Sequence, residues 1–235
     1  MKIVTNQKLI ERNKKIGQYT SIGSLVILLA GLYFSFQSTA YSIVIAFSAL
    51  LLGFILSQVG IYFGTRWGRS PRPDEVITAS LKGLEEKYTL YHYLTGVSHL
   101  LVGPAGIWVL IPYAVKGMIT YDEKKERWKH KGGSIYLKIF AQEGMGRPDL
   151  DIENDVAEAR KYIKKMTEGE PVLPIQAALI FVNDKITVDA ANAPAPTLAA
   201  GKIKDFFRRK AKEEPVSMEI IKNIQAVLPK DTVTV

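Results

Sequence analysis

The strongest pattern in the chain is a stretch of 50 residues, from Ile16 to Thr65, that contains no charged residue. A single helix of that length would be roughly 75 Å long at about 1.5 Å per residue, whereas a bilayer core of about 30 Å needs about 20 residues per crossing. The pattern therefore predicts two membrane-spanning helices, over residues 20–36 and 41–63, with the uncharged connector Gln37-Ser38-Thr39-Ala40 between them. Because backbone groups in lipid must be hydrogen-bonded within their segment, both spans should be helical and antiparallel.

Basic residues flank this predicted hairpin on both sides and are absent from its connector. The flanking residues are Lys2, Lys8, Arg12, Lys14 and Lys15 before the first span, and Arg66, Arg69 and Arg72 after the second. Since positive charge stays on the cytoplasmic side, we expect an integral protein of the cell (inner) membrane with both termini in the cytoplasm. The predicted organisation is a basic cytoplasmic N-terminus at 1–17, a transmembrane hairpin at 18–66 and a cytoplasmic domain at 71–235.

Two features of the hairpin leave alternatives open. The basic start, the apolar run and the small residues Ser38-Thr39-Ala40 also fit a secretory signal peptide that is cleaved after the first span. Gly60 with Gly64, and Gly53 with Ser57, have spacings that permit close helix packing, for which the first helix is a candidate partner. Glycine is also simply common in membrane helices.

Beyond the hairpin, strand-like and helix-like periodicities alternate, which predicts a single α/β domain. Apolar runs at 97–102 and 107–111, joined by the turn Gly103-Pro104-Ala105-Gly106, predict two central strands covered on both faces. Further strands are expected at 88–94, 117–121, 134–140, 175–182 and 186–188, and helices at 74–87, 151–167, 197–212 (capped by Thr197) and 217–228. The charged stretch from Asp122 to Gly133 is interpreted as a turn.

The amino-acid composition and net charge limit the kinds of site and partner that the chain can have. The chain has no cysteine, which excludes disulfides, thiol catalysis and thiolate metal sites. Its net charge is +8, and the first fifteen residues, with five Lys/Arg and one Glu, supply half of it. A basic juxtamembrane segment is attracted to anionic lipid, by about 1 kcal/mol per charge. The positive charge is therefore only weak support for a nucleic-acid partner.

A second basic segment lies in the helix expected at 197–212. Lys202, Lys204, Arg208, Arg209 and Lys210 surround the aromatic pair Phe206-Phe207. One interpretation is a surface for an anionic ligand, either a phosphate or a lipid headgroup. The other is an amphipathic helix whose two aromatic rings pack in the core.

The segment VSHLLVGPAGIWVLIPYAVKGMITYDEKKERW, residues 97–128, resembles the core of the nuclease-related domain (NERD) family. The matching features are an apolar strand, the Gly103-Pro104-Ala105-Gly106 turn, a second apolar strand, Lys116-Gly117 and Trp128. Most of residues 74–210 follow the family's order of elements. The resemblance implies a restriction-endonuclease-like mixed sheet with flanking helices. The expected α/β fold is therefore an N-terminal transmembrane helical hairpin followed by this sheet.

The resemblance also implies metal-dependent phosphodiester cleavage, in which carboxylates hold Mg²⁺ and a lysine stabilises developing charge. The positions that should carry these groups are occupied by Ser98, Ile111 and Tyr113. The chain therefore resembles a degenerate member without metal ligands, a pseudoenzyme. A residual polar site could include Glu75, His99 and Lys116, whereas Asp122, Glu123 and Glu126 are interpreted as part of a solvated turn.

These observations favour a non-catalytic, membrane-anchored module that acts by interaction or scaffolding at the cytoplasmic face, as an accessory part of a membrane assembly. Its expected partners are the lipid bilayer and a protein at the membrane, and no cofactor is expected. One alternative is an active membrane-tethered nuclease with a relocated site that uses Mg²⁺ or Mn²⁺. Another is a DNA-binding membrane tether that does not cleave.

Overall fold

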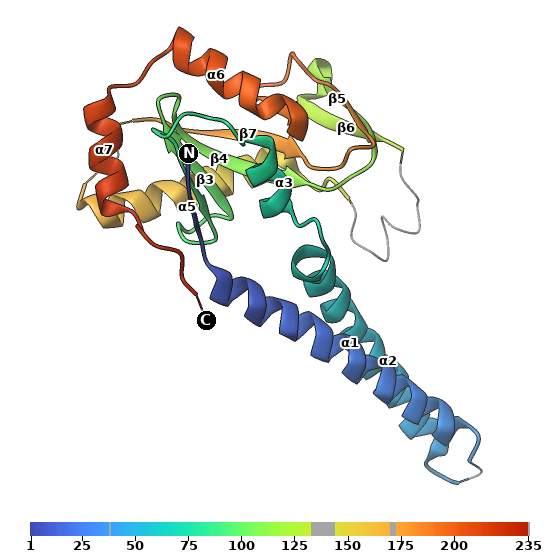
Figure 1. Cartoon of the computed structure of the whole chain (residues 1–235). Coiled ribbons are helices and arrows are strands. Elements are labelled where there is room, and N and C mark those ends of the chain that lie inside the picture. The colour runs from blue at the N-terminus through green and yellow to red at the C-terminus, as the bar shows by residue number, and fades with distance from the viewer. Residues whose placement is uncertain (38, 133–143, 170–172, 235) are drawn as a thin grey trace. The chain divides into compact units, whose positions relative to one another are not determined.

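The computed structural model describes residues 1–37, 39–132, 144–169 and 173–234, and the chain divides into two compact units (Figure 1). One unit holds the segment Lys8–Arg72. The other holds Met1–Gln7 together with the described residues from Pro73 onward, and it is a mixed α/β structure. The strand expected at 134–140 lies outside the described residues.

The first unit contains the two long apolar helices, α1 (Gln7–Ser35) and α2 (Ser42–Phe63), followed by a short π-helical turn at Gly64–Gly68. Both helices are long enough and apolar enough to cross a membrane. The two predicted helical spans are therefore confirmed as helices. Helix α1 begins at Gln7 rather than near residue 20, so the basic segment before the apolar span is part of the same helix.

Small residues bring α1 and α2 into close contact. A Cβ atom on Gly60 would lie 3.0 Å from the backbone nitrogen of Ser21, and one on Gly53 would lie 3.4 Å from the carbonyl oxygen of Ser24. The expectation that Gly53 and Gly60 pack against the first helix is confirmed. A Cβ atom on Gly64 would meet nothing within 4 Å, so a side chain there has room, although a Cβ atom on Gly17 of α1 would lie 2.9 Å from the backbone nitrogen of Gly64.

The α/β unit is built on a six-stranded sheet in the order β1-β2-β3-β4-β7-β9. Its strands are β1 (Lys2–Thr5), β2 (Thr89–His92), β3 (His99–Gly103), β4 (Gly106–Tyr113), β7 (Ile175–Phe181) and β9 (Thr197–Ala199). Strands β2, β3 and β4 are antiparallel, whereas β1 pairs parallel with β2, and β4, β7 and β9 are mutually parallel. Expected strands at 88–94, 97–102, 107–111 and 175–182 are confirmed.

Helices cover both faces of this sheet, which explains the continuous apolar runs of β4 and β7. Helices α5 (Pro148–Thr167) and α7 (Met218–Val227) pack on one face, where Val109, Ile111 and Leu179 point. Helices α3 (Pro73–Ser80) and α6 (Ile203–Glu213) pack on the other face, where Leu110 and Ile180 point. Figure 1 shows α3 and α5 beside the central strands.

A second, three-stranded sheet has the order β6-β5-β8, with β5 (Gly117–Asp122), β6 (Arg127–Lys131) and β8 (Ile186–Asp189). The strands expected at 117–121 and 186–188 are confirmed. The interpretation of Asp122–Gly133 as a turn is wrong, because β6 lies within it. Only Glu123–Glu126 forms the turn, with Glu126 in the left-handed region at φ 48° and Asp122 paired with Arg127.

A further strand was not predicted, and two of the predicted helices have different bounds in the structure. This strand is β1, and it lies in the segment assigned to a basic N-terminus. The helix expected at 74–87 ends at Ser80, before Gly83 adopts φ 87°. Thr197 does not cap a helix: it starts β9, its hydroxyl accepts a hydrogen bond from Trp128 Nε1 at 3.0 Å, and α6 begins only at Ile203.

Replacing Gly60 with Val should destabilise the hairpin, whereas the same replacement at Gly64 should not. The added side chain at Gly60 overlaps Ser21, and such overpacking costs about 1–3 kcal/mol. We expect the thermal midpoint of the full chain in detergent, followed by circular dichroism, to fall by about 5 °C for Gly60→Val. Equal midpoints for Gly60→Val and Gly64→Val would contradict the observed helix contact.

Candidate functional site

The three positions where the nuclease resemblance expects metal chemistry lie at neighbouring ends of β3 and β4. The antiparallel register pairs Leu100 with Val109, and its continuation brings Ser98 opposite Ile111. Ile111 is a core residue, only 6% exposed, on the face covered by α5. A hydrocarbon side chain packed in this way supplies no ligand for a cation.

Tyr113, at the position expected for a catalytic lysine, is bound within the fold. Its hydroxyl donates a hydrogen bond to Asp151 Oδ2 on α5, and its ring stacks on Phe181 with centroids 5.5 Å apart. Burial, followed by the hydrogen bond to Asp151 and the charges of the nearby carboxylates, raises the pKa of Tyr113 well above its ordinary value. The phenol is therefore held neutral, with its hydroxyl already engaged.

A pair of histidines forms the most unusual polar contact in the described part of the α/β unit. His92 on β2 and His99 on β3 are cross-strand partners, each 1% exposed, and their Nδ1 atoms lie 2.7 Å apart. At that distance the two nitrogens can share one proton, but they cannot both carry one, because two N–H groups would then face each other. Thr78 on α3 lies 2.9 Å from the Nε2 atom of His92.

The polar contacts continue next to this histidine pair. Tyr93, with φ 61°, packs its ring 5.1 Å from that of His99, and its hydroxyl donates to Asp74 Oδ1 at 3.3 Å. Asp74 is 4% exposed. Imidazole, phenol and carboxylate are groups that can exchange protons. Sequence reasoning singled out His99 and missed His92, because the spacing of seven residues indicates a contact only once the strand register is known.

The three residues proposed for a residual polar site have different surroundings. Glu75 is half-buried on α3, His99 is buried against His92, and Lys116 is exposed in the link between β4 and β5. The backbone carbonyl of Lys116 accepts a hydrogen bond from His130 Nε2 at 2.7 Å. Among the described residues, no group of three or more His, Asp or Glu side chains is arranged to hold a metal ion.

The basic residues Lys204, Arg208, Arg209 and Lys210 lie on α6, and Lys202 lies in the 3-10 turn before it. Three of them already have partners. Arg208 donates to the Gly83 carbonyl oxygen at 2.8 Å, Arg209 lies 3.8 Å from Glu213, and Lys210 lies 2.7 Å from Glu214. Phe207 is fully buried, as the core interpretation of this aromatic pair expects.

The acidic residues near 122–126 serve the turn between β5 and β6. The Asp122 carboxylate accepts the backbone N–H groups of Lys124 and Lys125 at 3.1 and 3.2 Å. A hydrogen bond from Lys129 lowers the pKa of Asp122. Asn192 donates to Glu123 at 2.7 Å, so these acids do not converge on one point.

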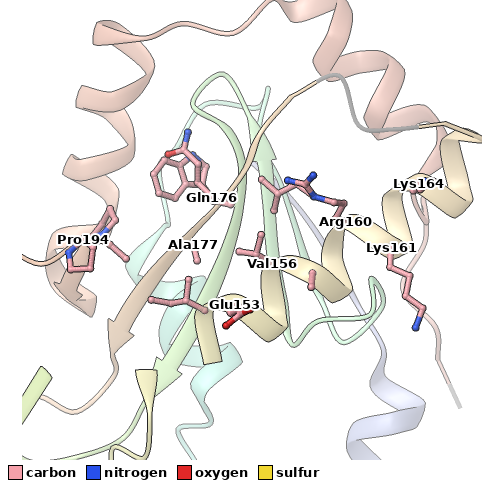
Figure 2. Close-up of a pocket in the computed structure, with 14 residues that line it drawn as sticks. Glu153, Val156, Arg160, Lys161, Lys164, Gln176, Ala177 and Pro194 are labelled. Atoms are coloured by element: carbon pink, nitrogen blue, oxygen red, sulfur yellow. The ribbon is translucent and has the colours of Figure 1, made fainter. Parts of the chain in front are cut away.

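A concavity lies at the opposite end of β4, where α5 passes over the start of β7 (Figure 2). It is a hollow of about 740 Å³. Its lining combines an apolar floor with polar groups on one side: Trp108, Ile152, Glu153, Val156, Ala157, Arg160, Lys161, Lys164, Ile175, Gln176, Ala177, Pro194, Ala195 and Pro196. Sequence reasoning did not identify this site, since its residues come from four separate segments.

Comparison with known proteins found no match: no protein-family model, no curated protein and no solved structure matches the chain.

Tyr113 should make the folded state sensitive to alkaline pH. The unfolded chain loses its phenolic protons near pH 10, whereas burial raises the pKa of Tyr88 and of Tyr91 to about 12 and that of Tyr113 further. Stability is therefore full below pH 10 and falls as the pH rises above it. Tyr113→Phe should be less stable at pH 7, by about 1 kcal/mol, and should lose this deficit at pH 11.

The control for this comparison is Tyr121→Phe, whose ring packs on Trp128 with centroids 5.0 Å apart. Urea unfolding of the full chain in detergent at pH 7 and pH 11 measures both variants. A Tyr113→Phe deficit that stays constant between the two pH values would contradict the shifted pKa.

Proposed function

We propose that the chain is a membrane-anchored, non-catalytic module that resembles a degenerate member of the nuclease-related domain family. It acts by interaction or scaffolding at the cytoplasmic face of the cell membrane, as an accessory part of a membrane assembly. In this proposal the sheet has the restriction-endonuclease-like arrangement, and α1 and α2 form its transmembrane anchor.

The observation that carries the proposal is the pairing of β1 with β2. Strand β1 precedes α1, and β2 follows α2, yet Lys2 to Thr5 pair in register with Thr89 to His92. Both ends of the helical hairpin are therefore connected to one sheet. An anchor that crosses a bilayer twice satisfies this constraint, because it returns the chain to the side from which it left.

The exposed surfaces of α1 and α2 support placement in lipid. Their exposed large apolar residues include Ile22, Leu25, Val26, Leu29 and Leu32 on α1, and Ile43, Val44, Phe47, Leu50 and Phe54 on α2. Such surfaces are costly in water at about 25 cal/mol per Å² of apolar area. Basic residues flank both helices outside the apolar segments, which favours the cytoplasmic orientation.

The absence of catalysis is proposed from what occupies the expected site. Ile111 belongs to the core, and the hydroxyl of Tyr113 is bound to Asp151. Neither side chain can bind Mg²⁺ as a carboxylate does or donate positive charge as a lysine does. An interaction module needs the folded scaffold but not these groups.

A nuclease assay on the full chain in lipid nanodiscs tests this proposal. We expect no cleavage of single- or double-stranded DNA or RNA with Mg²⁺ or Mn²⁺, relative to a chelator control. Cutting that survives repurification and is abolished by Glu75→Gln or Asp122→Asn would overturn it in favour of a relocated site. Salt-sensitive DNA binding without cutting would instead favour a nucleic-acid tether.

The proposed orientation is tested by single cysteines, since the natural chain has none. Thr39→Cys lies in the connector of the hairpin, and Ser217→Cys lies at the start of α7. In intact spheroplasts, a membrane-impermeant maleimide should label Thr39→Cys, whereas Ser217→Cys should react only after permeabilisation. The reverse pattern would contradict the orientation, and loss of the first 40 residues would indicate signal-peptide cleavage.

A further inference from the structure

The hollow between α5 and β7 is separate from the positions of the expected nuclease site. Its lining includes Trp108 and Ala177, near the amino ends of β4 and β7, whereas Ile111 and Tyr113 lie toward the carboxyl end of β4. Parallel pairing of Trp108 with Gln176 places these two residues side by side. The hollow can therefore be occupied without disturbing the contacts of Tyr113.

The apolar part of the lining is both extensive and held in place. Ile175 and Ala177 of β7 are each 7% exposed and belong to the core under α5, whereas the Trp108 ring packs on Phe206 and Phe207 of α6 on the other face of the sheet. Ile152 and Val156 from α5, and Pro194 from the loop before β9, form the walls. A hollow of about 740 Å³ is within the range of roughly 300–1,000 Å³ that small-molecule sites occupy.

Two polar side chains in the lining have no partner in the described part of the chain. Neither the Arg160 guanidinium nor the Gln176 amide forms a hydrogen bond or ion pair with another described residue. In Figure 2, Arg160 extends from α5 toward the strands, whereas the neighbouring Lys161 extends away from them. Lys161 also lies 3.6 Å from Glu158 on its own helix. Of these two neighbouring cations, Arg160 is the one that faces the hollow.

We propose that this hollow binds a small amphiphilic carboxylate. The apolar body of the ligand would lie over Val156 and Ala177. Its carboxylate would accept hydrogen bonds from Arg160, a planar donor that matches carboxylate geometry in a bidentate manner. Glu153 at the rim disfavours a second negative charge on the ligand.

The test uses the full chain in nanodiscs and ¹⁹F NMR line widths of 6-fluoro-2-naphthoate, with 6-fluoro-2-naphthamide as the neutral counterpart. Empty nanodiscs correct for partition into lipid. We expect the carboxylate to bind about tenfold more tightly than the amide, because charge-assisted hydrogen bonds are the stronger ones. Equal affinity for the two probes, or no binding to the folded chain, would overturn the proposal.

Two variants and one control locate the site. Arg160→Gln should weaken carboxylate binding about tenfold and leave amide binding unchanged. Lys161→Gln removes the same charge one residue away and should change the affinity by less than about twofold, since the Lys161 side chain extends away from the strands and lies 3.6 Å from Glu158. Ala157→Phe, an exposed lining position, should abolish binding of both probes by filling the hollow. Equal effects of the Arg160 and Lys161 variants, or unaltered binding by Ala157→Phe, would refute the site.

Competition with decanoate distinguishes two sources of the ligand. Displacement of the naphthoate would show that the hollow accepts a flexible chain, such as an acid released from membrane lipid. Retention of the naphthoate would show that it selects a rigid ring, as a soluble aromatic acid provides. Both outcomes retain the assignment of the site to carboxylates.

Discussion

The parallel pairing of β1 with β2 is the constraint on which the connectivity of the whole chain depends. Parallel strands cannot be joined by a tight turn and require a crossover connection. Here the crossover contains α1, α2 and α3, so the entire apolar hairpin is an insertion between two adjacent strands. The pairing is secured at both ends, by a hydrogen bond from Lys2 N to Tyr88 O at 2.8 Å and one from Asn6 N to His92 O at 3.0 Å.

Strand register, more than residue type, determines which polar groups meet. His92 and His99 face each other because β2 pairs with β3 in the register that also opposes Leu90 and Leu101. A slip of one residue would reverse the faces of β2, exposing core residues and separating the two imidazoles. The histidine contact and the hydrophobic core therefore specify the same register.

The elements predicted correctly from the sequence are those whose own hydrophobic pattern identifies them, without knowledge of the neighbouring elements. Strands β4 and β7 are continuous apolar runs, and α2 is apolar throughout, so each was recognisable without its neighbours. The unpredicted strands are short and gain their stability from distant partners. In β6, only Trp128 points inward among the charged residues of Arg127–Lys131, and in β9, Thr197 exchanges its expected capping role for a bond with Trp128.

The same reasoning explains why the candidate sites were only partly predictable. The resemblance to the nuclease family places Ile111 and Tyr113 where catalytic groups are expected, and that expectation needs residue identity alone. It could not show that the Tyr113 hydroxyl is bound to Asp151, nor that Arg160 faces a hollow lined by Val156 and Ala177. At the carboxyl end of β4, the Tyr113 hydroxyl is bound to Asp151 within the fold. At the amino end of β4, the neighbouring Arg160 has no partner among the described residues. A search for ligands should begin at the second end.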